Sequence, residues 1–525
     1  MFLSSSITQL RHLRGCGGVA FAVAVLAGWV APAEAARATP LVEAAKRADR
    51  AAVKVLLAQG VDVNQSGHDG TVALHWAAHH GDLETLIRLV DAGADVAATN
   101  RYGIAPIWLA SQNGHTAVVD ALLRAGVDPD SSRGTSGETV LMIAARGGHV
   151  EVLRRLVAQG ATVNTQERIR HQTALMWAAA EGHLAAVRLL AGSGADLEAR
   201  SSTGMTPLMF AIRSGSIDVT REMLDQGAEL KATAPDGTTM LVLAIINAHW
   251  ELAAFLLDRG ADPMRDDPQH GRPLHVLTFM RRAENRGLSA WLPRRPSGNI
   301  DTIELATRLL ERGAEINDRV DWENGMRFPP HMALGMFPGV SFTGGTPFYI
   351  AAKQCDMEFM RFLLAHGADP SLGTVHNVSP LLAAAGVGYT IGESPGTPEE
   401  ALEAVQWLQT LGNDVQATMD EGASGSTGTL TGGSWAGASA LHGAVIRGAE
   451  GLVKWLIDEG VPLDHRMRSG ETALDLAEGS DLGITYHVQP GLAAVIRDAM
   501  IAQGLDVHDR SARAHDDAVP AEVTR

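Results

Sequence analysis

Apolar and polar residues follow each other along most of the chain in short runs with helical spacing. Residues 69–96 (DGTVALHWAAHHGDLETLIRLVDAGADV) give the clearest example, because apolar side chains recur there every three or four positions on both sides of a Gly-Asp turn. A Thr or a Pro at the start of such a run favours helix initiation, and a Gly favours its end. The pattern predicts pairs of short helices.

The predicted helix pairs repeat with one period. A Thr-Pro-Leu-like tripeptide begins each pair, and the residue in its proline position serves as a marker. The markers are Pro40, Ala73, Pro106, Val140, Ala174, Pro207, Met240, Pro273, Pro347, Pro380, Ala440 and Ala473. Nine of the eleven intervals are 33 or 34 residues long, and the other two, of 74 and 60 residues, correspond to one period plus an insertion. Since one unit of this size does not bury its apolar face alone, we expect a single solenoid of stacked units.

These repeats resemble the ankyrin repeat family over residues 40–506. The resemblance rests on the marker tripeptide, an Ala-Ala pair, a Gly-His or Gly-Asp turn, a Leu-Leu pair and a Gly-Ala-Asp ending. It implies an all-α repeat solenoid of about twelve helix-turn-helix units with β-hairpin connections. It also implies binding of another protein, although a fold by itself does not fix a function.

Two units carry extra residues at equivalent places. In unit eight they lie between the helices (281–299) and in the following hairpin (318–344), and in unit ten they lie at 386–398 and 418–438. The first insertion is a basic island around Trp291, the second carries Trp322 and Phe328, and the fourth is rich in Gly, Ser and Thr around Trp435. The arginines of the basic island are Arg281, Arg282, Arg286, Arg294 and Arg295. Such loops suit contact with a partner; the alternative is that they fold back on the solenoid as a lid.

Residues 1–35 have the pattern of a secretory signal peptide. Arg11 and Arg14 precede an apolar run at 19–30, and the small residues of 33–35 (AEA) suit cleavage near Ala35. The run is shorter than the ~20 residues of a spanning helix, which favours a cleaved leader over an uncleaved anchor. We expect an exported protein, periplasmic or secreted, whose mature chain has no membrane span. The solenoid would occupy residues 36–506, followed by a disordered tail at 507–525.

Composition excludes several classes of protein. Hydrophobic residues make up 46% and charged residues 20%, which is typical of a folded soluble protein. The net charge of −17 argues against a general nucleic-acid or anionic-membrane binder. Without the leader, which contains Cys16, the remaining Cys355 has no partner for an intrachain disulfide or a cysteine zinc site.

Catalytic and metal-binding motifs are absent from the sequence: it contains no G-x-S-x-G, Walker loop, H-E-x-x-H or C-x-x-C. His75 and His79 have the spacing of a metal pair, but His75 stands in the histidine position of the T-P-L-H motif, where the resemblance implies a backbone hydrogen bond between units. The Gly-His histidines recur with the period and are interpreted as scaffold. Cys355 replaces a turn glycine and is interpreted as a structural thiol. We predict no catalytic residue, no metal site and no cofactor.

The resemblance places the variable residues of the hairpin tips and first-helix ends on a groove. The corresponding predicted binding residues are His68, His79, His80, Arg101, Tyr102, Gln112, Asn113, Arg146, Glu181 and Arg213. Trp291, Trp322, Phe328 and Trp435 are added as aromatic anchors on the insertions, with the main contact expected across units eight to eleven. We predict a monomeric, non-catalytic scaffold for another protein. The alternative is an enzyme or small-ligand-binding protein with a site formed by the insertions.

Overall fold

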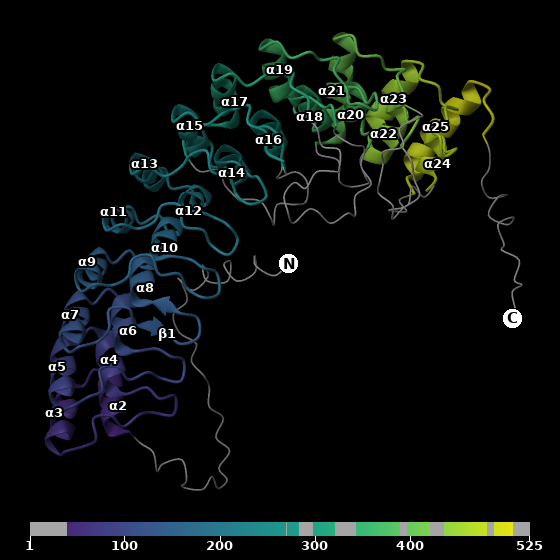
Figure 1. The fold of residues 1–525 in the computed structure, drawn as a ribbon. Coiled ribbons are helices and arrows are strands. Elements are labelled where there is room, and N and C mark those ends of the chain that lie inside the picture. Colours follow the sequence, from purple (N-terminus) through teal and green to yellow (C-terminus); the bar gives the residue numbers. More distant parts are fainter. Residues whose placement is uncertain are drawn as a thin grey trace, which may run out of the picture.

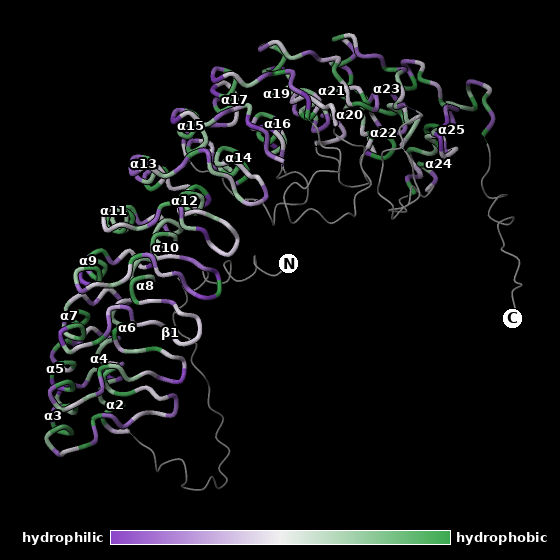
Figure 2. The backbone as a smooth tube through the Cα atoms, viewed as in Figure 1, coloured by the Kyte–Doolittle hydropathy of each residue, from purple (hydrophilic) through white to green (hydrophobic). Residues whose placement is uncertain are grey.

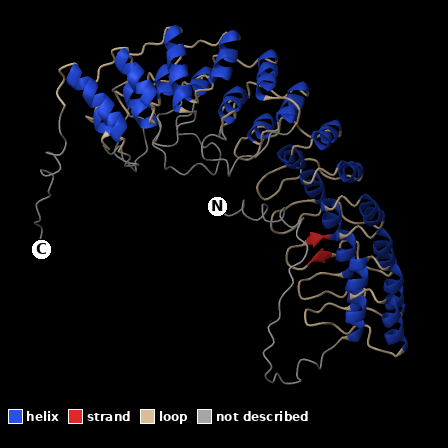
Figure 3. Cartoon of the chain, turned by 180° about the vertical axis from the view of Figure 1, so that it is seen from behind, coloured by secondary structure: helices blue, strands red, loops and turns tan. Residues whose placement is uncertain are grey.

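The computed structural model describes residues 39–268, 270–282, 298–320, 343–388, 396–420, 435–479 and 488–507. Over these ranges the chain forms helix pairs stacked side by side into a curved arc (Figure 1). The first helix of each pair lies on the inner side of the arc and the second on the outer side, and the view from behind shows the same two layers (Figure 3). The predicted leader (1–35) and residues 508–525 lie outside the described residues.

Every first helix of the twelve described pairs begins at the marker residue found in the sequence. These helices are α2 (Pro40–Lys46), α4 (Ala73–His80), α6 (Pro106–Gln112), α8 (Val140–Arg146), α10 (Ala174–Ala180), α12 (Pro207–Ser214), α14 (Met240–Ile246), α16 (Pro273–Met280), α18 (Pro347–Lys353), α20 (Pro380–Ala385), α22 (Ala440–Arg447) and α24 (Ala473–Ala477). The second helices are α3 (Arg50–Ala58), α5 (Leu83–Asp91), α7 (Thr116–Arg124), α9 (Val150–Ala158), α11 (Leu184–Gly192), α13 (Ile217–Asp225), α15 (Trp250–Asp258), α17 (Thr302–Glu311), α19 (Met357–Ala365), α21 (Pro398–Thr410), α23 (Glu450–Asp458) and α25 (Pro490–Ala502).

Local capping or a proline at the first position explains where most of the first helices begin. The hydroxyl of Thr206 accepts a hydrogen bond from the backbone N–H of Met209, and Pro207 fills the first helical position, where no N–H is needed. Thr173 and Thr346 cap α10 and α18 in the same way. The predicted role of Thr and Pro in starting these helices is confirmed.

The core runs along the whole arc between the two helix layers. The alanine pairs of consecutive first helices, Ala144–Ala145 and Ala178–Ala179, are fully buried, so α8, α10 and α12 pack closely against one another. Leu190 on α11 is fully buried as well. Along the helices, hydrophobic and hydrophilic positions alternate (Figure 2), as expected for helices buried on one side.

A left-handed residue follows most first helices. Gly81 has a φ of 70°, and a Cβ added there would lie 2.6 Å from Nδ1 of His115 in the next unit, so both backbone and space require glycine. Ala48, Ala248 and Cys355 hold the same turn with φ of 54°, 56° and 53°. The prediction that Cys355 replaces a turn glycine is confirmed.

The hairpin tips project from the inner helix layer into the concave side (Figure 1). Paired strands are confined, among the described residues, to β1 (Ser132–Arg133) and β2 (Glu138–Thr139), which are antiparallel. Backbone hydrogen bonds join neighbouring tips elsewhere: the N–H of Arg101 donates to the carbonyl of Asp69 (2.8 Å), and that of Ser202 donates to Arg170 (2.7 Å). The tips therefore form one continuous row.

The stack continues across both interruptions of the period. Helix α16 ends at Met280 and α17 begins at Thr302, yet α16 packs against α18 and α15 against α17. In unit ten, α20 likewise packs against α22, although α21 ends at Thr410 and α22 begins at Ala440. Stacking of first helices is thus kept where the connections lengthen.

Candidate functional site

The ten polar residues predicted for binding are all exposed and lie in two neighbouring rows. His68, Arg101 and Tyr102 are on hairpin tips. The other seven lie at the C-terminal ends of first helices or in the turns that follow: His79, His80, Gln112, Asn113, Arg146, Glu181 and Arg213. Both rows belong to the inner side of the arc (Figure 1). The structure therefore brings these residues together on one surface, here called the concave surface.

Histidines of the following unit contact the backbone carbonyl groups of this surface. Nε2 of His115 is 3.0 Å from the carbonyl oxygen of His79, and Nε2 of His149 is 2.9 Å from that of Gln112. His183 and His249 make the same contact with the carbonyls of Arg146 and Arg213. Each contact satisfies a carbonyl that the helix end leaves without an intrahelical partner. The interpretation of the Gly-His histidines as scaffold is confirmed.

The histidines of the T-P-L-H position are buried and structural. Nδ1 of His75 accepts the backbone N–H of Val72 at 3.2 Å, and Nε2 lies 2.9 Å from the carbonyl of Ile104 in the next unit. Burial lowers the pKa of His75, and it lowers the pKa of His275 and His442 to about 4. Among the described residues, no three His, Cys, Asp or Glu side chains gather as a metal site would require.

Aromatic residues on the same surface were missed by the sequence analysis. Trp76 lies under Lys46 (Nζ 5.6 Å from the ring centroid), and Trp177 lies under Arg146 (guanidinium carbon 5.1 Å from the centroid). Phe210 is buried (4% exposed) beneath this surface, and the guanidinium carbon of Arg213 lies 5.1 Å from its ring centroid. Trp76, Trp177 and Phe210 all stand three positions after their markers, which is the signal that would have revealed them. Each contact is a cation–π interaction that holds the cation at the concave surface.

Of the four aromatic anchors predicted on the insertions, the structure describes one. Trp291, Trp322 and Phe328 lie outside the described residues. Trp435 is 5% exposed and belongs to the core, so the prediction that it offers its ring to a partner is wrong. The gain from removing a large indole from water explains its inward position.

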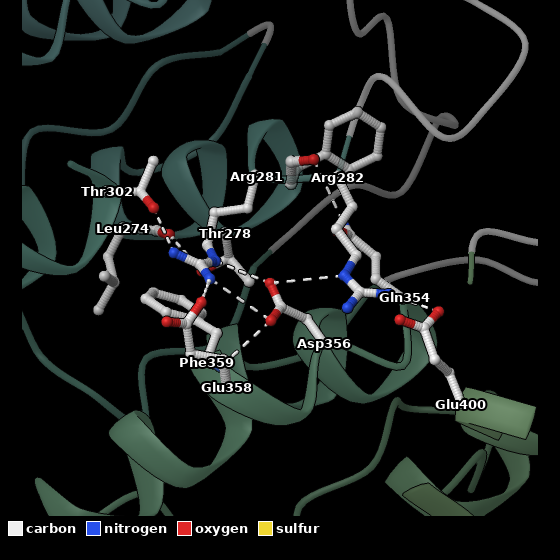
Figure 4. A network of polar contacts seen from close by, with 11 residues as sticks. Leu274, Thr278, Arg281, Arg282, Thr302, Gln354, Asp356, Glu358, Phe359 and Glu400 are labelled. Atoms are coloured by element: carbon white, nitrogen blue, oxygen red, sulfur yellow. Dashed lines mark hydrogen bonds and ion pairs between the residues drawn. The ribbon is translucent and has the colours of Figure 1, made fainter. Parts of the chain in front are cut away.

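The two arginines that begin the basic island form ion pairs with carboxylates of the solenoid (Figure 4). Nε of Arg281 lies 2.7 Å from Oδ2 of Asp356, and its Nη2 lies 2.7 Å from Oε2 of Glu358. Arg282 places Nη1 2.9 Å from Oε2 of Glu400. Burial raises the pKa of Glu400, but hydrogen bonds from Arg282 and from the backbone of Thr397 outweigh it and lower the pKa. Arg281 and Arg282, the first two arginines of the predicted basic island, are therefore paired with carboxylates of the solenoid. Arg286, Arg294 and Arg295 lie outside the described residues.

The thiol of Cys355 is buried beside this network. Its side chain is fully buried, and Sγ lies 3.6 Å from the carbonyl oxygen of Ala384. Burial raises the pKa of Cys355, which disfavours the reactive thiolate. These contacts agree with its interpretation as a structural thiol.

In the ranges that the structure describes, none of the helices combines the length and the apolar character that crossing a bilayer requires.

Comparisons with known proteins point to one family. The profile for ankyrin repeats in three copies matches residues 25–100, 41–133, 107–201 and 190–267, and the single-repeat profile matches residues 343–374. The human transient receptor potential cation channel subfamily A member 1 is 34% identical over 91 residues, which are 17% of this chain and 8% of the channel. The Notch-regulated ankyrin repeat-containing protein of Xenopus tropicalis is 36% identical over 72 residues, 14% of this chain and 63% of that protein.

The chain thus spans less than two thirds of either relative. Among solved structures, the human ASB11 ankyrin repeat domain aligns with a TM-score of 0.40 and 28% identity, over 43% of this chain and 100% of that one.

Proposed function

Because the chain belongs to the ankyrin repeat family, whose members are generally protein–protein interaction modules, we propose that it is a non-catalytic scaffold that binds another protein through the concave surface. One observation carries this proposal: polar side chains that differ from unit to unit are exposed in two adjacent rows, on a backbone whose helices and hairpin tips are fixed by bonds between units. A preorganised surface of this kind loses little conformational entropy on binding.

A pull-down from the cell-envelope fraction tests the use of this surface. The bait is the purified protein, compared with a variant in which Tyr102, Gln112 and Glu181 become alanine. A matched control changes Val55, Ile87 and Gln159, which are exposed on or at the end of the outer helices α3, α5 and α9, to alanine. We expect a captured protein to be lost from the first variant and kept by the second. Equal capture by both variants would contradict the concave surface as the binding site.

The insertions are proposed to contribute to binding beside this surface. The structure indicates how to remove one of them without opening the solenoid. The N–H of Val320 donates to the carbonyl of Gly345 (3.0 Å), and the N–H of Gly344 donates to Val320 (2.7 Å), so the two ends of segment 321–342 are held together. A short glycine linker can therefore replace 321–342. If this variant unfolds at the same urea concentration as the wild type and keeps full binding, the insertion contributes nothing.

Export to the cell envelope, with the mature chain periplasmic or secreted, belongs to the same proposal. The order of charged, apolar and small residues in 1–35 supports it. N-terminal sequencing of the protein recovered from cells should begin near Ala36. Recovery of intact residues 1–35 would contradict cleavage.

A further inference from the structure

Charge is distributed unevenly between the two sides of units one to six. On the concave side, the first-helix ends carry Lys46, Arg47, Arg146 and Arg213. The hairpin tips of the same units add Arg101, Arg133, Arg168, Arg170 and Arg200. The acidic residues at these places are fewer: Glu43, Asp69, Glu138, Glu167, Glu181 and, on the tip between units six and seven, Asp236. The concave surface of an acidic protein is therefore basic over these units.

Most of the carboxylates on this side are occupied locally. Asp69 accepts hydrogen bonds from the backbone N–H and the hydroxyl of Thr71, at 3.0 and 2.8 Å. Glu167 is buried and accepts the backbone N–H groups of Ile169 and Arg170, each at 2.7 Å. These acids fix the shape of the tips, and their hydrogen bonds are to backbone and hydroxyl groups rather than to the surrounding cations.

Most of the concave cations lack carboxylate partners in the described part of the chain. Arg47 and Arg133 lie near Glu43 and Glu138, at 3.9 and 3.5 Å. In the described part of the chain, the other seven basic residues of this surface have no carboxylate oxygen within 4.0 Å. Their side-chain contacts are with neutral groups, such as the Trp177 ring under Arg146.

The outer side behaves in the opposite way. Arg50 pairs with Asp82 at 2.9 Å, and Arg188 pairs with Glu222 at 2.6 Å. The Gly-Ala-Asp turns, which follow the second helices, also carry exposed acids, among them Asp95 and Asp196. Unpaired positive charge is thus concentrated on the face that the proposed function assigns to a partner.

Exposed apolar side chains interrupt the basic tips. Tyr102 is 51% exposed beside Arg101, and Ile169 is 69% exposed between Arg168 and Arg170. A partner that covers these tips needs carboxylates for the cations and apolar side chains for Tyr102 and Ile169.

Resting on the proposed function, we propose that the concave surface of units one to six binds an acidic protein segment that also carries apolar side chains. Carboxylates form bidentate pairs with arginine, and the fixed cation–π contacts hold several cations in place before binding. A protein segment fits better than a nucleic acid, because the net charge of −17 repels a long polyanion.

Fluorescence anisotropy with a defined probe tests this inference. The probe is a fluorescein-labelled peptide of glutamates interspersed with leucines, and the matched probe has glutamine at every glutamate position. We expect the purified protein to bind the glutamate peptide about tenfold or more tightly than the glutamine peptide, with an affinity that falls as salt is raised.

Two variants with the same change of charge provide the control. The first changes Arg101, Arg146 and Arg170 to glutamine on the concave surface of units three to five. The second changes Arg124, Arg154 and Arg188 to glutamine on the outer helices of the same units. The first should lose about tenfold in affinity for the glutamate peptide and the second less than about twofold. Circular dichroism and urea unfolding of both variants verify that they fold.

The inference is wrong if the glutamate peptide does not bind, or if both variants lose affinity equally, or if single-stranded DNA or anionic vesicles bind the concave surface more tightly than the peptide. The proposed function is tested separately by the pull-down. If a captured protein is lost with the alanine variant at Tyr102, Gln112 and Glu181 and yet is kept by the arginine variant, that result would support the scaffold function and contradict the binding of an acidic segment.

Discussion

Arg281 and Asp356 form an ion pair with 2.7 Å between Nε and Oδ2, although 75 positions separate them in the sequence. Asp356 caps α19 by accepting the backbone N–H of Phe359, and Arg281 also bonds to Thr302 at the start of α17. The pair therefore joins the N-terminal ends of two successive outer helices.

Arg281→Met should destabilise the protein by about 3 kcal/mol, because it removes the nearer of the two guanidinium groups beside the buried carboxylate of Asp356 and leaves only Arg282, 4.0 Å away. The side chains of Arg281 and Asp356 are only 8% and 4% exposed. The matched control is Arg361→Met, which removes a pair with Glu403 whose side chains are 57% and 56% exposed and should cost less than about 1 kcal/mol. Urea unfolding followed by circular dichroism measures both. Equal losses would show that the Arg281 pair is solvated.

Leu190→Ala should cost roughly 2–5 kcal/mol, since the side chain is fully buried in a central unit and its removal leaves a cavity between neighbouring helices. Leu189→Ala, one position earlier and only partly buried, should cost clearly less. The comparison uses the urea midpoints of the two variants. A loss below half a kcal/mol for Leu190→Ala, measured against about 2 as the lower bound, would contradict its place in the core.

Ala48→Gly should stabilise the protein by up to about 1 kcal/mol. Ala48 is exposed and has a φ of 54°, a left-handed conformation that costs an alanine more than a glycine. Ala51→Gly, at an exposed position within α3, should have the opposite sign and destabilise by up to about 1 kcal/mol. Thermal unfolding of both variants checks the prediction, which fails if the two changes shift the midpoint in the same direction.

Stability should fall as the pH drops from about 6.5 towards 4. Burial lowers the pKa of His275 and His442 to about 4, whereas an unfolded histidine titrates near 6.5. The unfolded chain binds more protons in this window, so the contribution of each buried neutral histidine, up to about 3 kcal/mol, is complete above pH ~6.5 and lost towards pH ~4.

The pH dependence can be assigned to a single side chain. His275→Gln should reduce the difference between the urea midpoints at about pH 7 and about pH 5, whereas His68→Gln, on an exposed hairpin tip, should leave it unchanged. An unchanged difference in the His275 variant would contradict the assignment.

The start of every described first helix could be predicted from the sequence because capping is local. Thr206 and Pro207 act on backbone groups within one turn, so the tripeptide carries the information that fixes the helix. The left-handed turn at Cys355 could be predicted for the same reason, from its position in the period.

Features that depend on distant residues could not be read in this way. The pairing of Arg281 and Arg282 follows from Asp356 and Glu400, which approach these two arginines only in the folded stack. Trp435 was assigned to a surface loop by composition, and its burial is decided by packing that the local sequence does not encode. The aromatic row of Trp76, Trp177 and Phe210, in contrast, could have been found by comparing equivalent positions of the units.

The histidine contacts between units also mean that each unit is completed by residues that are synthesised after it. The carbonyl of His79 receives its hydrogen bond from His115, and that of Gln112 from His149, so the chain that leaves the ribosome first is completed by the chain that follows. Among the described residues, a long delay of this kind occurs at unit eight, where Arg282 and its partner Glu400 are 118 positions apart. A chain synthesised only as far as a point between these two residues therefore lacks the partner of Arg282 and has an incomplete end of the solenoid.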